Sequence, residues 1–100
     1  MKNVLKFKFQ DKEGFLSIVE KNNHYYALIE KDTSKVAEIQ KTKKLLISYE
    51  LKQPNYKEVI VDVLFDQTLT KWVFDKLESE KNLYFKELND RLCVLEIAKE

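Results

Sequence analysis

Residues Ile29–Glu50 read "IEKDTSKVAEIQKTKKLLISYE", and this stretch carries the strongest indication of the fold. An apolar strand ends in the polar turn "DTSK". Val36 and Ile39 then follow at helical spacing, and "LLISYE" resumes a strand. Asp32 or Thr33 is suited to cap the helix, because a short side-chain oxygen there can accept a hydrogen bond from an unpaired helix amide. The same amides can bind an anion. The turn is therefore either a plain helix cap or a binding site for an anion.

Three strands precede this turn. In Val4–Gln10 apolar residues alternate with lysines, which predicts a half-buried strand. "DKEG" ends that strand, and Gly14 can supply the positive φ angle that a hairpin turn needs. Phe15–Glu20 and His24–Glu30 follow as the second and third strands, with "KNN" between them. Short turns between consecutive strands predict an antiparallel meander.

The second half of the chain adds three strands and a helix. Leu45–Leu51 alternates, whereas Glu58–Asp66 and Leu92–Ala98 are apolar on both faces. Between the last two, "TLTKWVFDKLE" has the apolar spacing of a helix, with Thr68 or Thr70 as its cap. A strand that is apolar on both faces must be buried on both faces. In so short a chain, a closed barrel can bury such strands without helices packed on both sides of the sheet. We therefore predict a mainly β fold with two helices, a six-stranded antiparallel barrel in the order β-β-β-α-β-β-α-β.

Length and composition limit the classes of function. One hundred residues suit one domain spanning residues 1–100. The net charge is only +1, from 18 basic and 17 acidic residues, so overall charge gives no support for binding nucleic acid or a membrane surface. Lysines interrupt the apolar residues of the N-terminal "MKNVLKFKFQ", and no apolar run approaches the ~20 residues that span a bilayer. We expect a cytoplasmic protein with no membrane or nucleic-acid partner.

The chemistry-bearing residues are few. Cys93 is the only cysteine and lies in an apolar run, so we expect a small buried thiol and no intrachain disulfide. His24 is the only histidine, which argues against a metal site because such sites need several ligands. One glycine cannot build a Gly-rich phosphate loop, and no serine–histidine–aspartate arrangement can be proposed. The sequence therefore predicts no catalytic side chain and no metal ligand.

The element order and the polar turn together resemble the flavin-mononucleotide (FMN)-binding split-barrel family, the pyridoxamine 5′-phosphate oxidase-like proteins that include small general stress proteins. In that family a β-meander ends in a tight turn with serine or threonine followed by lysine, then a short helix and an alternating strand. Here these parts read Thr33-Ser34-Lys35, "VAEIQKTKK" and "LLISYE". The later order is similar too: "VIVDVLF", "TLTKWVFDKLE" and "RLCVLEIA". The resemblance runs from Gly14 onward and implies a six-stranded antiparallel split β-barrel.

The resemblance also implies a ligand, which is FMN or another phosphorylated small molecule. Thr33, Ser34 and Lys35 would hold the phosphate, because hydroxyls and helix amides donate hydrogen bonds to it and the lysine adds a positive charge. The family forms its ring slot between two subunits, so a homodimer is implied. Aromatic residues that become candidate walls of that slot are Tyr25, Tyr26, Trp72 and Tyr84. An enzyme of this kind would be an FMN-dependent oxidoreductase in which the flavin carries the hydride chemistry.

Several positions depart from the family pattern. Ile29 stands where family members carry a threonine, and the second strand, "FLSIVE", has no cation to reach a phosphate. Lys41-Thr42-Lys43 replaces an asparagine–proline pair, and Asp32 adds a negative charge beside the turn. These departures support an alternative hypothesis, in which the split barrel has lost its cofactor and serves as a structural or protein-interaction module. The sequence leaves both hypotheses open.

Overall fold

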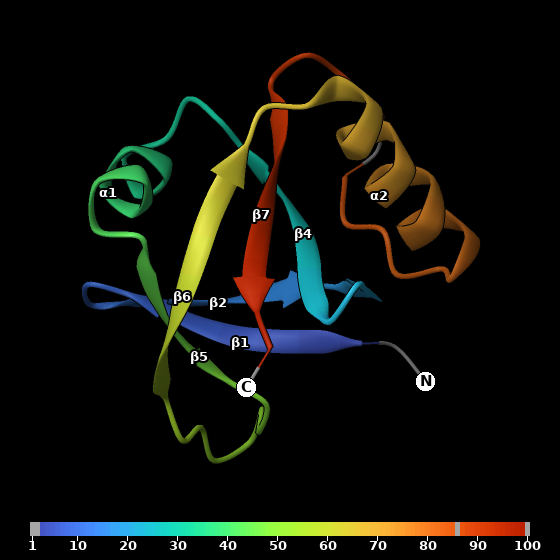
Figure 1. Ribbon diagram of the computed structural model, residues 1–100. Helices are drawn as coiled ribbons and strands as arrows, with labels where there is room; N and C mark the ends of the chain where they lie inside the picture. Colours follow the sequence, from blue (N-terminus) through green and yellow to red (C-terminus); the bar gives the residue numbers. More distant parts are fainter. Residues whose placement is uncertain (1–2, 86, 100) are drawn as a thin grey trace.

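Seven strands and two helices make up the computed structural model, which describes residues 3–85 and 87–99 (Figure 1). In chain order they are β1 (Val4–Phe9), β2 (Lys12–Ser17), β3 (Val19–Lys21), β4 (His24–Glu30), α1 (Ser34–Thr42), β5 (Lys44–Ser48), β6 (Lys57–Leu64), α2 (Gln67–Ser79) and β7 (Leu92–Ala98). The bounds predicted for β4 and β7 are confirmed.

All seven strands belong to one antiparallel sheet in the order β2-β1-β5-β6-β7-β4-β3. The two edge strands, β2 and β3, are consecutive in the chain and only Ile18 lies between them. The sheet must therefore curl until its two edges meet at Ile18. In Figure 1, β4, β6 and β7 run across the direction of β1 and β2, as this curl requires.

The prediction of six strands is wrong by one, because the expected strand Phe15–Glu20 is divided at Ile18. Its first part lies in β2 and pairs with β1, whereas its second part forms β3 and pairs with β4. At the break, the Ile18 amide donates to the carbonyl oxygen of Asn3 at 3.0 Å, and the Ile18 side chain is buried. One continuous stretch, bent at Ile18, thus supplies residues to both edge strands of the sheet.

The expected role of Gly14 in a hairpin turn is also wrong. Gln10, with φ 55°, takes the left-handed conformation between β1 and β2. Gly14 instead lies inside β2, where its Cα is paired across the ladder with that of Phe7. The next hairpin, between β3 and β4, turns at Asn22 and Asn23, with φ angles of 51° and 65°. Asparagine tolerates this conformation better than most residues, which is why "KNN" makes a tight turn.

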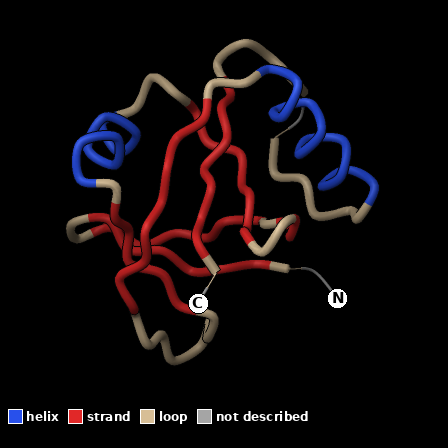
Figure 2. The backbone as a smooth tube through the Cα atoms, in the orientation of Figure 1, coloured by secondary structure: helices blue, strands red, loops and turns tan. Residues whose placement is uncertain are grey.

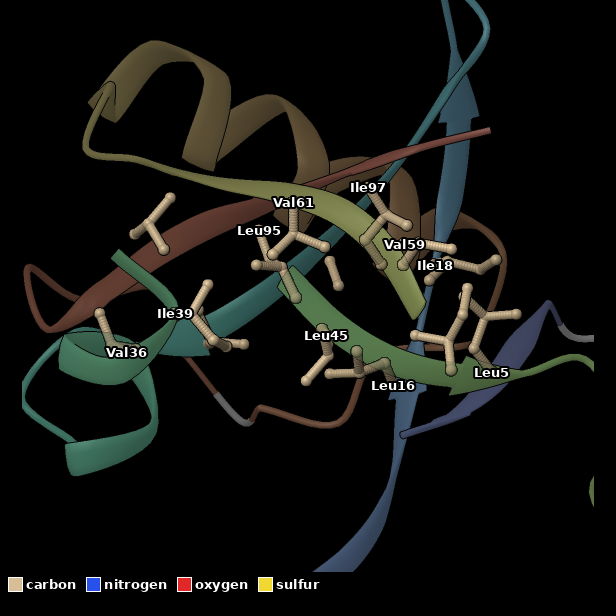
Figure 3. Packing of buried hydrophobic residues seen from close by; sticks show 14 of the residues in the cluster. Leu5, Leu16, Ile18, Val36, Ile39, Leu45, Val59, Val61, Leu95 and Ile97 are labelled. Carbon is tan, nitrogen blue, oxygen red and sulfur yellow. The ribbon is translucent and has the colours of Figure 1, made fainter. Parts of the chain in front are cut away.

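The curled sheet encloses the larger of two apolar clusters, part of which is shown in Figure 3. Two residues of α1, Val36 and Ile39, close one end of it. Cys93 lies within this cluster and is fully buried, as predicted, and burial raises the pKa of its thiol to about 11. The cluster consists of Leu5, Leu16, Ile18, Ala27, Ile29, Val36, Ile39, Leu45, Ile47, Val59, Val61, Val63, Cys93, Leu95 and Ile97.

The second cluster lies between α2 and the outer faces of β3, β4 and β7. Figure 2 shows the two helices on opposite sides of the sheet. The N-cap of α2 is Asp66, whose Oδ1 accepts a hydrogen bond from the Leu69 amide at 3.1 Å, and not Thr68 or Thr70 as predicted. Among the described residues, no helix has the length and apolar character needed to cross a bilayer.

Candidate functional site

The N-terminus of α1 is capped by Thr33, one of the two residues predicted for this role. Thr33 has an extended backbone, and its Oγ1 accepts a hydrogen bond from the Val36 amide at 3.3 Å. The same hydroxyl donates to the carbonyl oxygen of Glu30 at 3.1 Å, which ties the start of α1 to the end of β4. Asp32 is exposed. The first amides of the helix, at Ser34 and Lys35, have no partner within the helix itself and remain able to bind an anion.

Lys35 folds back from the first turn of α1 onto an aromatic ring. Its Nζ lies 4.5 Å from the centroid of the Phe7 ring, within the range of a cation–π interaction. Burial lowers the pKa of Lys35, and the nearby carboxylate of Glu30 opposes this shift. The ammonium group is therefore partly desolvated, and a partly desolvated cation interacts more strongly with an anion than a fully hydrated one.

Thr33 and Lys35 both line a pocket of about 530 Å³ beside the start of α1. This volume falls within the range of small-molecule sites, roughly 300–1,000 Å³. The strands β2 and β4 supply part of the wall, and the segment after α2 supplies another part. The lining residues are mainly apolar: Phe7, Gly14, Phe15, Leu16, Ser17, Leu28, Ile29, Glu30, Thr33, Lys35, Leu77, Tyr84 and Phe85.

Four aromatic side chains stand around this pocket. Phe7 is half-buried, whereas Phe15 and Tyr84 are 62% and 84% exposed. Tyr84 and Phe85 meet edge to face, with ring centroids 5.4 Å apart and planes at 89°. Aromatic faces open to solvent beside a cavity suit a flat ring system, because stacking removes apolar surface from water on both partners.

The structure brings together some of the predicted site residues and separates others. Thr33 and Lys35 lie at the pocket, whereas Ser34 is exposed and outside its lining. Of the four aromatics suggested for a ring slot, only Tyr84 lines the pocket. The remaining three have other contacts: Tyr25 meets Tyr49, the Tyr26 hydroxyl donates to Glu96 at 2.9 Å, and Lys21 lies over Trp72.

Phe7, Phe15 and Phe85 line the pocket but were not singled out by the sequence. Phe7 alternates with lysines, which predicts only that it faces the core side of a strand. Phe15 begins one of the expected strands, and its neighbours in the sequence do not distinguish it from any other strand residue. Phe85 lies outside regular structure, so no period could place it.

The charges at the pocket are nearly balanced. Lys35 supplies a cation and Glu30 a carboxylate, while Asp32 is absent from the lining. Neither His24 nor Cys93 lines the pocket. Within residues 3–85 and 87–99, no group of three or more histidine, cysteine, aspartate or glutamate side chains could hold a metal ion. The pocket therefore places one cation and one carboxylate beside a group of aromatic rings.

A second pocket of about 420 Å³ lies at the start of α2. Its cations are Lys31 and Lys71, and Lys71 is already paired with Asp75, with Nζ and Oδ2 2.7 Å apart. Asp90 adds a further negative charge. Since no predicted site residue reaches this pocket, the pocket beside α1 is the candidate site.

Comparisons with solved structures identify the fold. A "Putative Pyridoxamine 5′-phosphate oxidase" from Listeria innocua is 13% identical with a TM-score of 0.64, over 99% of this chain and 83% of that one. General Stress Protein 26 from Bacillus anthracis str. Sterne is 18% identical with a TM-score of 0.58, over 96% of this chain and 77% of that one. No protein-family model and no curated protein matches the sequence. The predicted resemblance is confirmed for the architecture: the chain has the fold of the pyridoxamine 5′-phosphate oxidase-like split-barrel proteins.

Proposed function

We propose that the pocket beside α1 binds FMN or a related phosphorylated ring compound. The observation that carries this proposal is that Lys35 and the capped start of α1 open onto the same cavity as four aromatic side chains. A flat ring and a phosphate are the two parts of such a ligand, and the pocket offers a suitable group for each. The two similar solved structures support the proposal through their shared fold.

The residues present fit FMN in kind. The ammonium and the backbone amide of Lys35 would hold the phosphate, since a helix N-terminus and an ammonium both favour an anion. Phe15 and Tyr84 would flank the ring, because both are exposed at the cavity. A bound flavin would supply hydride or electron transfer. The chain itself would bind the ring, orient it and exclude water from one of its faces.

Thr33 has a supporting role in this scheme. Its hydroxyl already donates to the carbonyl oxygen of Glu30 and accepts from the Val36 amide. Thr33 therefore fixes the start of the helix and does not serve as the main phosphate donor. This differs from the role implied by the resemblance, in which Thr33, Ser34 and Lys35 all contact the phosphate. The proposal therefore depends chiefly on the ammonium and the amide of Lys35.

Equilibrium titration tests the proposal. FMN, riboflavin and inorganic phosphate are added separately to the purified protein, and flavin fluorescence and near-ultraviolet to blue absorbance are followed. We expect a saturable change with FMN and weaker binding of riboflavin, which lacks the phosphate. Competition by inorganic phosphate would support the assignment of the start of α1 to the phosphate group of the ligand. Unchanged flavin spectra at protein concentrations up to the millimolar range would refute the proposal.

The alternative is a split barrel without a cofactor that acts as a structural or protein-interaction module. The observation that favours it is Glu30, whose carboxylate lines the pocket and would repel a dianionic phosphate. On β2, the lining residues are Gly14, Phe15, Leu16 and Ser17, none of them a cation. The same titration separates the two hypotheses, because this second one predicts no response to FMN.

We also propose that the protein is a homodimer. Large apolar side chains remain exposed, and two of them, Phe15 and Tyr84, stand at the candidate pocket. A second subunit placed there would cover both rings and complete the open side of the pocket. Light scattering at several concentrations tests this: we expect twice the 12.0 kDa chain mass, and a monomer at every concentration would contradict it.

A further inference from the structure

Gly14 and Phe7 form a fitted pair across the β1–β2 ladder. Their Cα atoms are direct partners in the register. A Cβ placed on Gly14 would lie 2.8 Å from both Cε1 and Cζ of the Phe7 ring, closer than such atoms approach in proteins. Gly14 has no positive φ angle, so its backbone does not require glycine. The physical reason for glycine at this position is that the Phe7 ring lies directly over it.

The Phe7 ring also contacts the ammonium of Lys35. Lys35 Nζ is 4.5 Å from the ring centroid, and both residues line the candidate pocket together with Gly14. The ring is half-buried and packs against the main apolar cluster. Three residues from three different elements, β1, β2 and α1, thus meet at the Phe7 ring: Gly14 lies against its Cε1 and Cζ, and the Lys35 ammonium lies over it, a group of contacts that we call the stack.

We propose that Phe7 is a positioning residue for the anionic end of the ligand: its ring, seated on Gly14, holds the Lys35 ammonium at the pocket. This inference rests on the proposed function and deepens it, because it assigns anion selectivity to a residue that carries no charge. A lysine side chain has a flexible stem of four carbons and loses much conformational entropy when its ammonium is fixed by an anion. A ring that already restricts the ammonium reduces that loss, so the site is preorganised.

The proposal separates two effects that Phe7 can have on a flavin. If the ring only adds apolar surface to the pocket, its removal weakens FMN and riboflavin alike. If the ring positions Lys35, its removal weakens FMN more than riboflavin, since only FMN has a phosphate. The ratio of the two dissociation constants is therefore the decisive quantity.

The main variant is Phe7→Leu, which keeps an apolar side chain but has no aromatic face. Phe9→Leu is the matched control, because Phe9 is also half-buried on β1 but does not line the pocket. We expect Phe7→Leu to weaken FMN about 2- to 30-fold more than riboflavin, the range of a cation–π interaction. Phe9→Leu should leave the ratio unchanged. An equal loss for both flavins in Phe7→Leu would overturn the proposal.

Gly14→Ala gives a second, independent variant if Phe7→Leu folds poorly. The new methyl group must displace the Phe7 ring, so we expect the same selective loss of FMN affinity. In Gly14→Ala combined with Lys35→Met, the ratio should equal that of Lys35→Met alone, because the stack acts only through the ammonium. A further change in the ratio would contradict the proposal.

A measurement without ligand distinguishes failure of this inference from failure of the proposed function. A ring 4.5 Å below the ammonium shifts the NMR resonances of the Lys35 side chain to low frequency through its ring current. We expect this shift in the wild-type protein and in Phe9→Leu, and its loss in Phe7→Leu. Normal lysine resonances in the wild-type protein would overturn the stack itself. Absence of flavin binding with the shift present would refute the flavin proposal alone.

Discussion

Replacing Lys35 by methionine should separate ligand binding from stability. Methionine is unbranched and of similar length, so it can occupy the same path over the Phe7 ring without a charge. Two effects on stability oppose one another. The cation–π interaction over Phe7 contributes roughly 0.5–2 kcal/mol in general, whereas burial of the ammonium costs free energy. The pKa of Lys35 is lowered, with burial as its largest cause, so folding disfavours the charged form on balance.

The sign of this shift fixes the expected result. A lysine whose pKa is lowered on folding contributes stability above its ordinary value of 10.5, and that contribution is lost as the pH falls through the lowered pKa. At neutral pH the ammonium therefore gives no net stabilisation. We expect the free energy of unfolding of Lys35→Met to lie within about 0.5 kcal/mol of the wild type, as for an ordinary surface change.

The loss of FMN affinity should be much larger. A hydrogen bond to a charged group contributes about 1.5–3 kcal/mol, which corresponds to a roughly 10- to 150-fold weaker dissociation constant. Urea denaturation measures the stability and flavin fluorescence titration the affinity. Lys41→Met is the matched control, because Lys41 lies in the last turn of the same helix and outside the pocket. Destabilisation beyond 1 kcal/mol with unchanged FMN affinity would refute our assignment of Lys35 to the ligand.

Three other predictions concern the cap, a turn and the pH dependence of stability. Thr33→Ala should lower the free energy of unfolding by about 1 kcal/mol in urea denaturation because the N-cap is lost. Thr33→Asp should keep the cap but lower the affinity for FMN in the same titration, because it adds a negative charge. Tighter FMN binding would contradict the binding of a phosphate at the start of α1. Asn23→Ala should destabilise by about 1 kcal/mol at φ 65°, whereas Asn23→Gly should not, and equal thermal midpoints would show that the turn is not strained. Burial and the hydrogen bond from the Tyr56 hydroxyl to Glu13 raise the pKa of Tyr56 from 10.0 to about 12. Its contribution to stability is therefore fully present below pH 10.0 and lost as the pH rises toward about 12; Tyr56→Phe should remove this part of the alkaline loss, as measured by denaturation across that range.

Local pattern predicted most of the elements but not how one of them is divided. The alternation of His24–Glu30 and Leu92–Ala98 places both strands correctly, because a period of two reports directly which side chains face the core. Phe15–Glu20 has the same alternation and yet is broken at Ile18. That break arises because one stretch must serve both edges of a curled sheet. No feature within the stretch itself encodes the positions of β1 and β4.

The candidate site could likewise be predicted only in part from the sequence. The polar turn identified the start of α1, and with it Thr33 and Lys35, since capping and helix amides are local properties. The walls of the pocket come from β1, β2 and the segment after α2, which are far apart in the chain. Their meeting depends on the curl of the sheet. Tyr25 and Trp72 were therefore suggested as walls, while Phe7 and Phe85 were not.

The sequence by itself determined a mainly β fold with two helices, a cap of α1 at Asp32 or Thr33, and the burial of Cys93, because each depends on the period or chemistry of a few neighbouring residues. Only the tertiary structure decided why Gly14 is a glycine. Its hydrogen atom leaves room for the Phe7 ring, and that ring in turn lies under Lys35. The first contact depends on the register of the β1–β2 hairpin, and the second depends on where the sheet places α1 beside β1. Their geometry is a property of packing and has no signature in the local pattern.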